Sequence, residues 1–562
     1  MDGLRSTGIR MCALLAFIMF MGCTVPLSSL ASASIGDITE QEKVILHLVN
    51  GSSIYQLDKQ LEAIGLKYPA FRSAGSIGAN ETADFIYKTF NGMGLHTWNE
   101  SFDFQTWDLR KVPSLMVDMD GNASTVEDRV ELESFQADHL SWPSLQNGSE
   151  GAVVVLPLPN TSSYSEIRYT PLDADSWEGI NTTGKIVVVG REVRWNSEWE
   201  RAYAAKLRAQ PPAGVILTYW NDWLEALSVY SMGSCGARPL SAYGDYYWQL
   251  NIPVGTLNYS DGRWLMMQAQ ASPTSALMRI DAVLGHGEHR NVVAKIEGSG
   301  NPDKMVLVTA HYDSVMTPGF CDNGAGTAAV LHLAQVLAQA QADGIYRPRF
   351  SLLFVAFTGE ELWTIGSMQF VHQHLDEMND ILAVVNLDCI GSENLFISET
   401  NAGPNFDLDE VAKQAATDLG ISLQVGPGGS DQDSFRTPYG AGQSYLRYWG
   451  VDPGISSAIP VDSSILVISE PLLIQDYWAS GKAGWIHTSR DASVPEGMPG
   501  WITPQKLQDG ASLAGLTVMR VSPSQSEGPI QYQPVLPYLI GLVVILIIVM
   551  AAILIFARRK GI

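Results

Sequence analysis

From residue 291 onward, short apolar segments alternate with longer segments whose apolar residues recur at helical spacing. We expect strands at 291–296, 304–310, 349–357 and 382–387, with helices at 326–342 and from Ser367 onward. Strands and helices that alternate in this way are typical of a mostly parallel sheet covered by helices on both faces. The sequence therefore predicts an α/β fold whose functional side chains lie just beyond the carboxyl ends of the strands.

Three of these predicted strands are followed by side chains that commonly bind metal ions. His311 follows the second strand, Asp322 lies in the next loop, Glu361 follows the third strand and Asp388 follows the fourth. Because the carboxyl ends of parallel strands meet at one edge of a sheet, we expect these side chains to converge. Imidazole and carboxylate ligands together suit zinc or a related divalent ion, and a pair of ions requires a bridging carboxylate. One more ligand is needed to complete such a pair.

Five segments resemble the successive motifs of the co-catalytic zinc aminopeptidases, a family typified by secreted bacterial leucyl aminopeptidases that also contains glutamate carboxypeptidases. The segments occur in the same order and at similar spacing: VLVTAHYDS, CDNGAGTAAVLHLA, FVAFTGEELWTIGS, VVNLDCIG and WIHTSRD. The resemblance implies the zinc exopeptidase fold and two Zn²⁺ ions. It also implies which residues bind them: His311 and Asp388 one ion, Glu361 and His487 the other, with Asp322 as the bridge.

The same resemblance implies that Glu360 is the general base and that Asp313 orients His311. Two cations lower the pKa of the water that they share, so that Glu360 can take its proton. The hydroxide between the ions then attacks the peptide carbonyl, and Glu360 returns the proton to the leaving amine. The resemblance further implies a cis peptide bond between Asp322 and Asn323.

Two positions depart from the family's pattern. Many members carry Ser-Asp-His or Ser-Asp-Tyr near the site, whereas this chain reads SDQDSF at 430–435. Some members place a tyrosine before the last histidine ligand to bind the oxyanion, and here that position is Ile486. The zinc ions or another donor must then stabilise the transition state. The stretch between Phe435 and His487 is longer than usual and is a candidate lid over the substrate pocket.

Other histidines and two cysteines near these motifs fit structural roles better than metal binding. The histidines lie on a helix with diverging directions, on an apolar helix or in a turn: His372, His374, His332, His286 and His289. Cys321 and Cys389 each adjoin a proposed ligand, but neighbouring residues on a strand face opposite ways. We expect small buried thiols there, and a disulfide between them is the alternative.

The two ends of the chain predict export and membrane anchoring. Two arginines precede an apolar run near the start, and Ala-Ser-Ala at 31–33 matches a signal-peptide cleavage site, so the mature chain would begin near Ser34. Lipid attachment at Cys23 is the alternative. Residues 538–557 are unbroken and apolar enough for a transmembrane helix, and the basic residues that follow predict a cytoplasmic C-terminus. Eight N-glycosylation sequons before residue 260 fit an exported surface.

Residues 135–282 have a β-rich texture and resemble a protease-associated domain through TTGKIVVVGR, PPAGVILTYW and IPVGTLNYSDGRWLMMQ. Such domains commonly interrupt these peptidases. We therefore divide the chain into a signal peptide at 1–33, a peptidase domain at 34–134 and 283–522 interrupted by the protease-associated domain at 135–282, a stalk at 523–537, a transmembrane helix at 538–557 and a cytoplasmic tail at 558–562.

The sequence as a whole predicts a membrane-anchored, extracytoplasmic di-zinc exopeptidase, and an aminopeptidase acting on peptides is the first choice. A net charge of -24 argues against nucleic acid as a partner. A carboxypeptidase or a dipeptidase of the same family is the nearest alternative. A catalytically inactive surface receptor and a glutaminyl cyclase that binds one zinc are further alternatives on the same scaffold.

Overall fold

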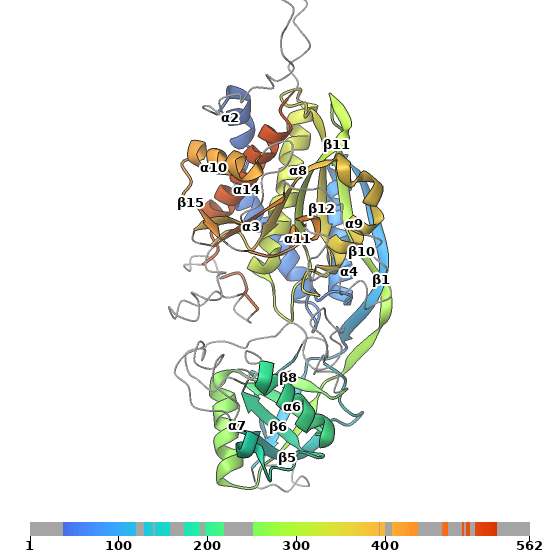
Figure 1. Cartoon of the computed structure of the whole chain (residues 1–562), viewed down its shortest axis with the longest axis vertical. Coiled ribbons are helices and arrows are strands. Elements are labelled where there is room, and N and C mark those ends of the chain that lie inside the picture. The colour runs from blue at the N-terminus through green and yellow to red at the C-terminus, as the bar shows by residue number, and fades with distance from the viewer. Residues whose placement is uncertain are drawn as a thin grey trace, which may run out of the picture.

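The computed structural model describes residues 38–119, 129–138, 141–157, 174–190, 197–218, 251–362, 364–392, 394–398, 407–426, 428–436, 464–469, 486–487, 491–494 and 501–524. Within them the chain forms two eight-stranded sheets, each with its own helices. Figure 1 shows the first sheet in the upper part of the molecule and the second sheet, with helices α6 and α7, in the lower part.

The first sheet has the strand order β1-β10-β12-β11-β13-β16-β14-β15. Its strands are β1 (His96–Leu109), β10 (Ala282–Ile296), β11 (Asn301–His311), β12 (Phe350–Phe357), β13 (Ile381–Asp388), β14 (Leu395–Ser398), β15 (Leu423–Gly426) and β16 (Ser464–Ser469). The pairs β11–β12, β11–β13, β13–β16 and β14–β15 are parallel, whereas β1–β10, β10–β12 and β14–β16 are antiparallel.

The prediction of a mostly parallel sheet is therefore wrong, because the sheet is mixed. The main cause is the long antiparallel pair of β1 and β10, which runs from the His96–Lys295 pairing to the Leu109–Ala282 pairing. β10 then joins the sheet by pairing antiparallel with β12. The apolar pattern of a strand indicates that it is buried, but it does not indicate the direction of the partner strand.

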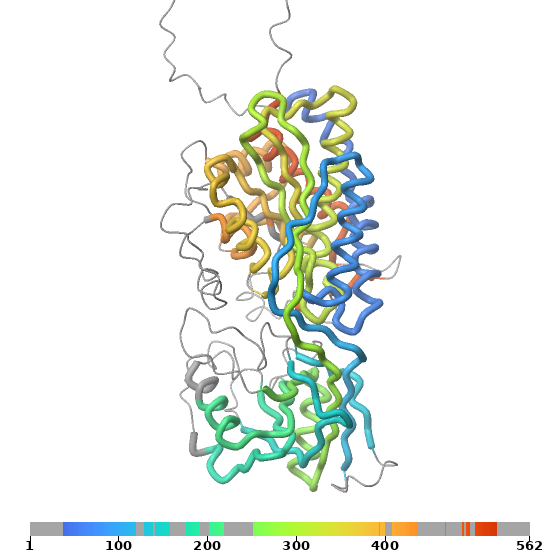
Figure 2. Tube along the Cα trace, turned by 90° about the vertical axis from the view of Figure 1, so that its right-hand side faces the viewer, coloured from blue at the N-terminus to red at the C-terminus, as the bar shows by residue number. Residues whose placement is uncertain are grey.

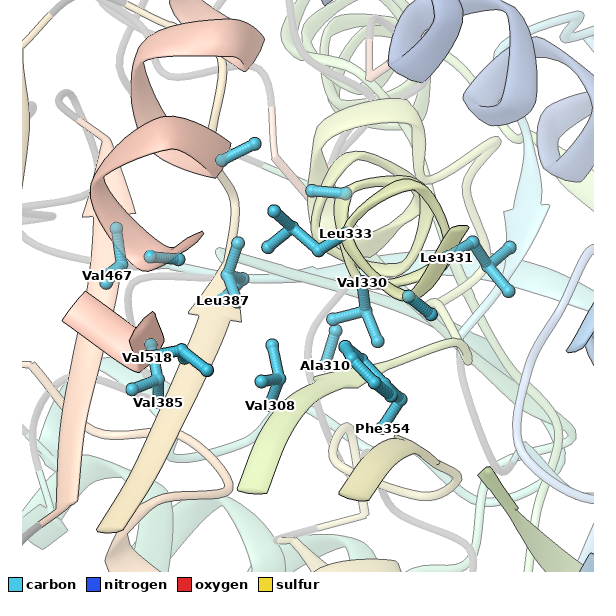
Figure 3. Close-up of a cluster of buried hydrophobic side chains, with 14 of the residues drawn as sticks. Val308, Ala310, Val330, Leu331, Leu333, Phe354, Val385, Leu387, Val467 and Val518 are labelled. Atoms are coloured by element: carbon cyan, nitrogen blue, oxygen red, sulfur yellow. The ribbon is translucent and has the colours of Figure 1, made fainter. Parts of the chain in front are cut away.

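Helices cover both faces of the first sheet, as the alternation of elements predicts. On one face, α3 (Gly51–Gly65), α4 (Ile77–Gly92), α8 (Gly326–Ala342) and α14 (Pro504–Val521) enclose a core that includes Val306, Val308 and Ala310 of β11. Figure 3 shows Val308 and Ala310 pointing toward α8. On the other face, Leu307 packs with residues of α9 (Ile365–Gln373). The period of two along β11 thus divides its side chains between two cores.

Local signals explain where these helices begin. The side chains of Asn50, Ser76 and Thr503 accept hydrogen bonds from the first turns of α3, α4 and α14, as N-cap residues do. α4 ends before Gly94, whose φ of 77° suits glycine. The predicted helix at 326–342 coincides with α8. The other helices that the structure describes in this part are α2 (Glu40–Leu46), α10 (Leu408–Leu419) and α11 (Asp433–Arg436), with a π-helix, η4 (Phe320–Ala325), and a 3₁₀ helix, η5 (Leu375–Asp380).

The second sheet has the order β3-β2-β9-β5-β6-β7-β8-β4. Its strands are β2 (Ser114–Asp118), β3 (Arg129–Glu131), β4 (Gln136–Ala137), β5 (Ser149–Leu156), β6 (Ile186–Gly190), β7 (Gly214–Thr218), β8 (Val254–Thr256) and β9 (Ser275–Arg279), with η1 (Ala174–Trp177), α6 (Ser197–Ala209) and α7 (Tyr259–Ala271). Figure 2 shows the blue and green strands β1 and β10 running down toward it. Because β2 and β3 belong to this sheet, it begins before residue 135. The likeness to a protease-associated domain stays a prediction.

The predicted signal peptide, transmembrane helix and cytoplasmic tail lie outside the described residues, as does most of the stalk. Within the ranges that the structure describes, no helix combines the length and the apolar character that crossing a membrane requires.

Candidate metal centre

The carboxyl ends of the central strands bring the predicted metal-binding side chains to one place. His311 is the last residue of β11 and Asp388 is the last residue of β13, which runs parallel to it. Glu361 follows the end of β12, and Asp322 lies within η4. All four side chains are buried. His487, far along the chain, joins them, and it has a φ of 55°.

The five side chains form two groups that share Asp322. In the first group, Nε2 of His311 lies 3.3 Å from Oδ1 of Asp388 and 3.4 Å from Oδ1 of Asp322. In the second, Nε2 of His487 lies 2.9 Å from Oδ2 of Asp322 and 3.4 Å from Oε2 of Glu361. The ligand atoms of each group lie within 4.8 Å of one another. Asp322 therefore presents one oxygen to each group, as a bridging carboxylate must.

The donor atoms fit zinc. Each group offers one imidazole nitrogen and two carboxylates, a mixture that Zn²⁺ accepts. Oε1 of Glu361 accepts a hydrogen bond from the backbone N–H of Val315 at 3.3 Å, whereas its buried Oε2 makes no hydrogen bond among the described residues and has only the 3.4 Å contact with Nε2 of His487. A buried carboxylate oxygen without a partner is costly, and a bound cation would compensate it.

The electrostatics of the two histidines reflect the surrounding carboxylates. Burial opposes a positive charge on His311, but Asp388, Asp313 and Asp322 outweigh burial and raise the pKa of His311 well above its usual value. Burial likewise opposes a charge on His487, but Glu361 and Asp322 raise its pKa well above the usual range. A cation between these groups would replace the protons that the histidines otherwise attract.

Asp313 connects the first group to the glutamates through backbone contacts. Nδ1 of His311 lies 3.1 Å from the carbonyl oxygen of Asp313 and 3.6 Å from its carboxylate Oδ1. The two carboxylate oxygens of Asp313 accept hydrogen bonds from the N–H groups of Glu360 at 3.2 Å and Glu361 at 3.3 Å. The carbonyl thus fixes the ring of His311, while the carboxylate fixes the chain that carries both glutamates.

Glu360 lies beside the two groups and is partly exposed, unlike its buried neighbour Glu361. Loss of hydration and the charges of Glu361, Asp388 and Asp431 raise the pKa of Glu360 well above its usual value, although His311 opposes this. Burial also raises the pKa of Glu361, so it is exposure that distinguishes the two glutamates.

Asp491 is a buried residue of the site that sequence reasoning did not single out. Its carboxylate accepts hydrogen bonds from the N–H groups of Cys321 at 2.6 Å and Asp322 at 3.1 Å. It belongs to the WIHTSRD segment, so its place four residues after His487 was the available signal. The peptide bond between Asp322 and Asn323 is cis, which confirms the expectation. The amide of Asn323 then links η4 to β13 by donating to the carbonyl of Leu387 at 2.9 Å.

The five other histidines that the sequence analysis considered stand outside the two groups. His332 accepts a hydrogen bond from the N–H of Asn50, His289 contacts the carbonyl of Gln105, and His374 bonds the carboxylates of Glu100 and Glu377. His286 lies exposed, 3.8 Å from Asp103, and His372 is also absent from both groups.

Cys321 and Cys389 are buried and form no disulfide, which confirms the prediction of buried thiols and excludes the disulfide alternative. The SDQDSF segment packs beneath the strand ends, where Ser367 donates to Asp431 at 2.6 Å and Asn386 donates to Ser430 at 3.1 Å. Most of the predicted lid between Phe435 and His487 lies outside the described residues.

Comparison with known proteins gives consistent results. Residues 291–492 match the model of Peptidase family M28. The chain is 32% identical over 192 residues to Aminopeptidase YwaD of Bacillus subtilis (strain 168), over 32% of this chain and 39% of that protein. It is 27% identical over 373 residues to an Aminopeptidase of Pseudomonas aeruginosa (strain UCBPP-PA14), over 66% of this chain and 63% of that protein. The chain thus spans less than two thirds of the length of either relative.

Among solved structures, BSAP, a zinc aminopeptidase from Bacillus subtilis, aligns with a TM-score of 0.56 at 21% identity, over 85% of this chain and 97% of that chain. The mixed sheet, with imidazole and carboxylate groups at the ends of its central strands, defines an α/β protein with a candidate metal centre. Residues 291–492 are similar to peptidase family M28. The family resemblance that the sequence motifs predicted is thereby confirmed.

Proposed function

We propose that this chain is a di-zinc exopeptidase, and specifically an aminopeptidase that removes N-terminal residues from peptides. One observation carries the proposal: the carboxylate of Asp322 stands between the Nε2 atoms of His311 and His487, at 3.4 Å and 2.9 Å. Two ions that share a carboxylate are the arrangement of aminopeptidases and other two-metal hydrolases. The relatives in Bacillus subtilis and Pseudomonas aeruginosa, which are named aminopeptidases, support the choice of reaction.

Each residue of the site then has a role. His311 and Asp388 would hold one zinc, Glu361 and His487 would hold the other, and Asp322 would be shared. Bound zinc would lower the pKa of water and polarise the carbonyl group of the substrate. Glu360 takes a proton from the attacking water and later gives it to the leaving amine. Asp313 holds the backbone N–H groups of Glu360 and Glu361, and with them the chain that carries the proposed base and the proposed ligand.

Specific features separate this proposal from its alternatives. A glutaminyl cyclase on this scaffold would need one ion, whereas the second group of Asp322, Glu361 and His487 offers a place for another. An inactive receptor would not need this complete ligand set. A carboxypeptidase or a dipeptidase would use the same metal centre and differ in the part of the substrate that it recognises. Export, with anchoring through residues 538–557, belongs to the same proposal and is supported by the sequence alone.

A substrate panel tests the choice of reaction. Full-length protein, extracted in detergent and supplied with zinc, is incubated with aminoacyl anilides, with the same anilides acetylated at the amine, and with peptides blocked only at the carboxyl end. An aminopeptidase cleaves the free-amine anilides and the carboxyl-blocked peptides but spares the acetylated anilides. The panel also includes peptides blocked only at the amino end, and cleavage confined to these peptides, whose carboxyl group is free, would instead identify a carboxypeptidase.

A further inference from the structure

A buried arginine from the amino-terminal part of the chain donates hydrogen bonds to the loop that joins the two metal groups. Arg72 follows α3 and is completely buried. Its Nε donates to the carbonyl of Tyr312 at 3.0 Å, its Nη1 to Pro318 at 2.6 Å and its Nη2 to Gly319 at 2.8 Å. These three carbonyls bound the loop from the residue after His311 to the residue before η4, so one guanidinium fixes both ends of the loop.

The backbone of the same residue holds the loop as well. The carbonyl oxygen of Arg72 accepts a hydrogen bond from the N–H of Ser314 at 3.3 Å. Gly319 has a φ of 64°, and a Cβ atom there would lie 2.8 Å from Nη2 of Arg72 and 2.7 Å from the carbonyl oxygen of Asp322. The loop therefore passes so close to Arg72 that only glycine fits, because a side chain would collide and the backbone would be strained.

Acidic side chains balance the buried charge of Arg72. The attractive charges around its guanidinium are those of Asp58, Asp491, Asp313 and Glu62, in decreasing order of effect. Asp58 is fully buried, and neither of its carboxylate oxygens has a hydrogen-bond partner within the described part of the chain. Burial raises the pKa of Asp58 well above its usual value, and the charge of Arg72 opposes this rise.

The same acidic residues reach the segment that follows His487. Glu62 of α3 accepts hydrogen bonds from the N–H and the hydroxyl group of Ser493. Asp491, two residues earlier, accepts from the N–H of Asp322. These hydrogen bonds tie α3 to the segment that follows His487, and that segment to the backbone of Asp322.

We propose that Arg72 is a positioning residue for the metal centre, holding the 312–319 loop and thereby the spacing between His311 and Asp322. The inference rests on the proposed di-zinc function. Residue 72 lies outside the 291–492 segment that defines the family, so the amino-terminal part of the chain would contribute directly to metal affinity. Arginine suits the role because its planar group donates in several fixed directions, whereas lysine provides a single compact charge.

Replacing Arg72 with lysine tests the proposal. Lysine keeps the positive charge but removes the planar guanidinium group, which donates hydrogen bonds through three nitrogens. The matched control is Arg520→Lys, which makes the same change at a largely buried arginine that pairs with Asp418 and Glu42 in another part of the fold. Zinc affinity is measured by competition with a chromogenic chelator, and the site geometry by the visible absorption of the cobalt-substituted protein. Thermal unfolding of the metal-free proteins measures the loss of stability separately.

We expect Arg72→Lys to lower zinc affinity by roughly 10- to 100-fold and to alter the cobalt spectrum, as loss of a residue that supports metal ligands does. Arg520→Lys should bind zinc as the unaltered protein does, even if both variants unfold at a lower temperature. Unchanged zinc affinity and an unchanged cobalt spectrum in Arg72→Lys would overturn the proposal while leaving the peptidase function intact. Unaltered protein that binds no zinc would overturn both.

If Arg72→Lys does not fold, the variant Asp491→Asn tests the proposal instead, because it changes the hydrogen bonds at the other end of the loop. The amide keeps an oxygen for only one of the backbone N–H groups of Cys321 and Asp322, which bond different oxygens of Asp491, and turns an NH2 group toward the other. Weakened zinc binding in this variant supports the positioning network, and affinity equal to that of the unaltered protein overturns it.

Discussion

Oδ2 of Asp322 lies 2.9 Å from Nε2 of His487, although the two residues come from distant parts of the chain. The other oxygen of Asp322 faces His311 at 3.4 Å. One carboxylate thus belongs to two groups of ligands, and its loss should affect both, whereas loss of an outer ligand should affect one. This difference makes the bridging role testable by counting ions.

The variants Asp322→Asn and Asp388→Asn should therefore bind different amounts of zinc. Asp388→Asn should keep close to one zinc per chain, because Asp322, Glu361 and His487 still form the second group. Asp322→Asn should keep less than one, because both groups lose a charged ligand. Metal analysis after dialysis against a weak chelator measures the content of each variant.

Asp343→Asn is the control, because Asp343 lies at the end of α8 and bonds Gln339 rather than either group. It should keep the metal content of the unaltered protein. Equal zinc loss in Asp322→Asn and Asp388→Asn would show that Asp322 is not shared.

Glu360→Gln should separate catalysis from metal binding. The amide has nearly the shape of the carboxylate but cannot take a proton, so kcat should fall by about 10²- to 10⁴-fold. Zinc content should stay unchanged, because neither donor group includes Glu360. Steady-state hydrolysis of an aminoacyl anilide together with metal analysis tests both statements. A variant that retains most of its activity would remove Glu360 from the role of base.

The strand ends could be predicted because each is an apolar segment followed directly by a polar residue. The segment before His311 and the segment before Asp388 are apolar, and each forms a strand that ends at the predicted residue. The helix at 326–342 was equally accessible, since its apolar residues keep a helical spacing. The spacing of apolar residues was sufficient to predict an element where a single segment carries both the buried residues and the functional residue.

Arg72 and Asp491 could not be found in this way. In a sequence, a buried arginine looks like a surface arginine, because its burial depends on partners from distant segments. Arg72 bonds carbonyls of the 312–319 loop, and Asp491 bonds the N–H groups of Cys321 and Asp322. The direction of β10 escaped prediction for the same reason, since its partners β1 and β12 are fixed by tertiary structure.

His374 should make stability depend on pH at a place remote from the metal centre. Burial disfavours its charge, but hydrogen bonds to Glu100 and Glu377 prevail and raise the pKa of His374 above its usual 6.5. A raised pKa means that the protonated form stabilises the fold fully below the unfolded value near 6.5, and that this contribution is lost as pH rises through the folded value. Urea unfolding of the unaltered protein and His374→Gln, from pH 5.5 to 8.5, measures it.

The stability difference between those two proteins should be largest at the acidic end and shrink toward the alkaline end. A difference that stays constant with pH would mean that the His374 ring contributes by packing alone, through its stacking on Phe370.

Leu333→Ala should destabilise the core between α8 and the first sheet. Leu333 is 1% exposed and lies in the cluster drawn in Figure 3. Truncation leaves a cavity beneath the helix, so the free energy of unfolding should fall by about 2–5 kcal/mol. Leu66→Ala, at a side chain that is 58% exposed, should change it by no more than about 0.5 kcal/mol. Similar losses in both variants would contradict this account of the core.

Zinc titration of the metal-free, full-length protein tests the central claim most directly, with bound zinc per chain and hydrolysis of an aminoacyl anilide followed in the same samples. We predict that binding ends at two zinc ions per chain and that activity reaches its maximum only when both are bound. Saturation at a single zinc with no further gain in activity, or binding of two ions with no hydrolysis of any free-amine substrate, would contradict the di-zinc aminopeptidase.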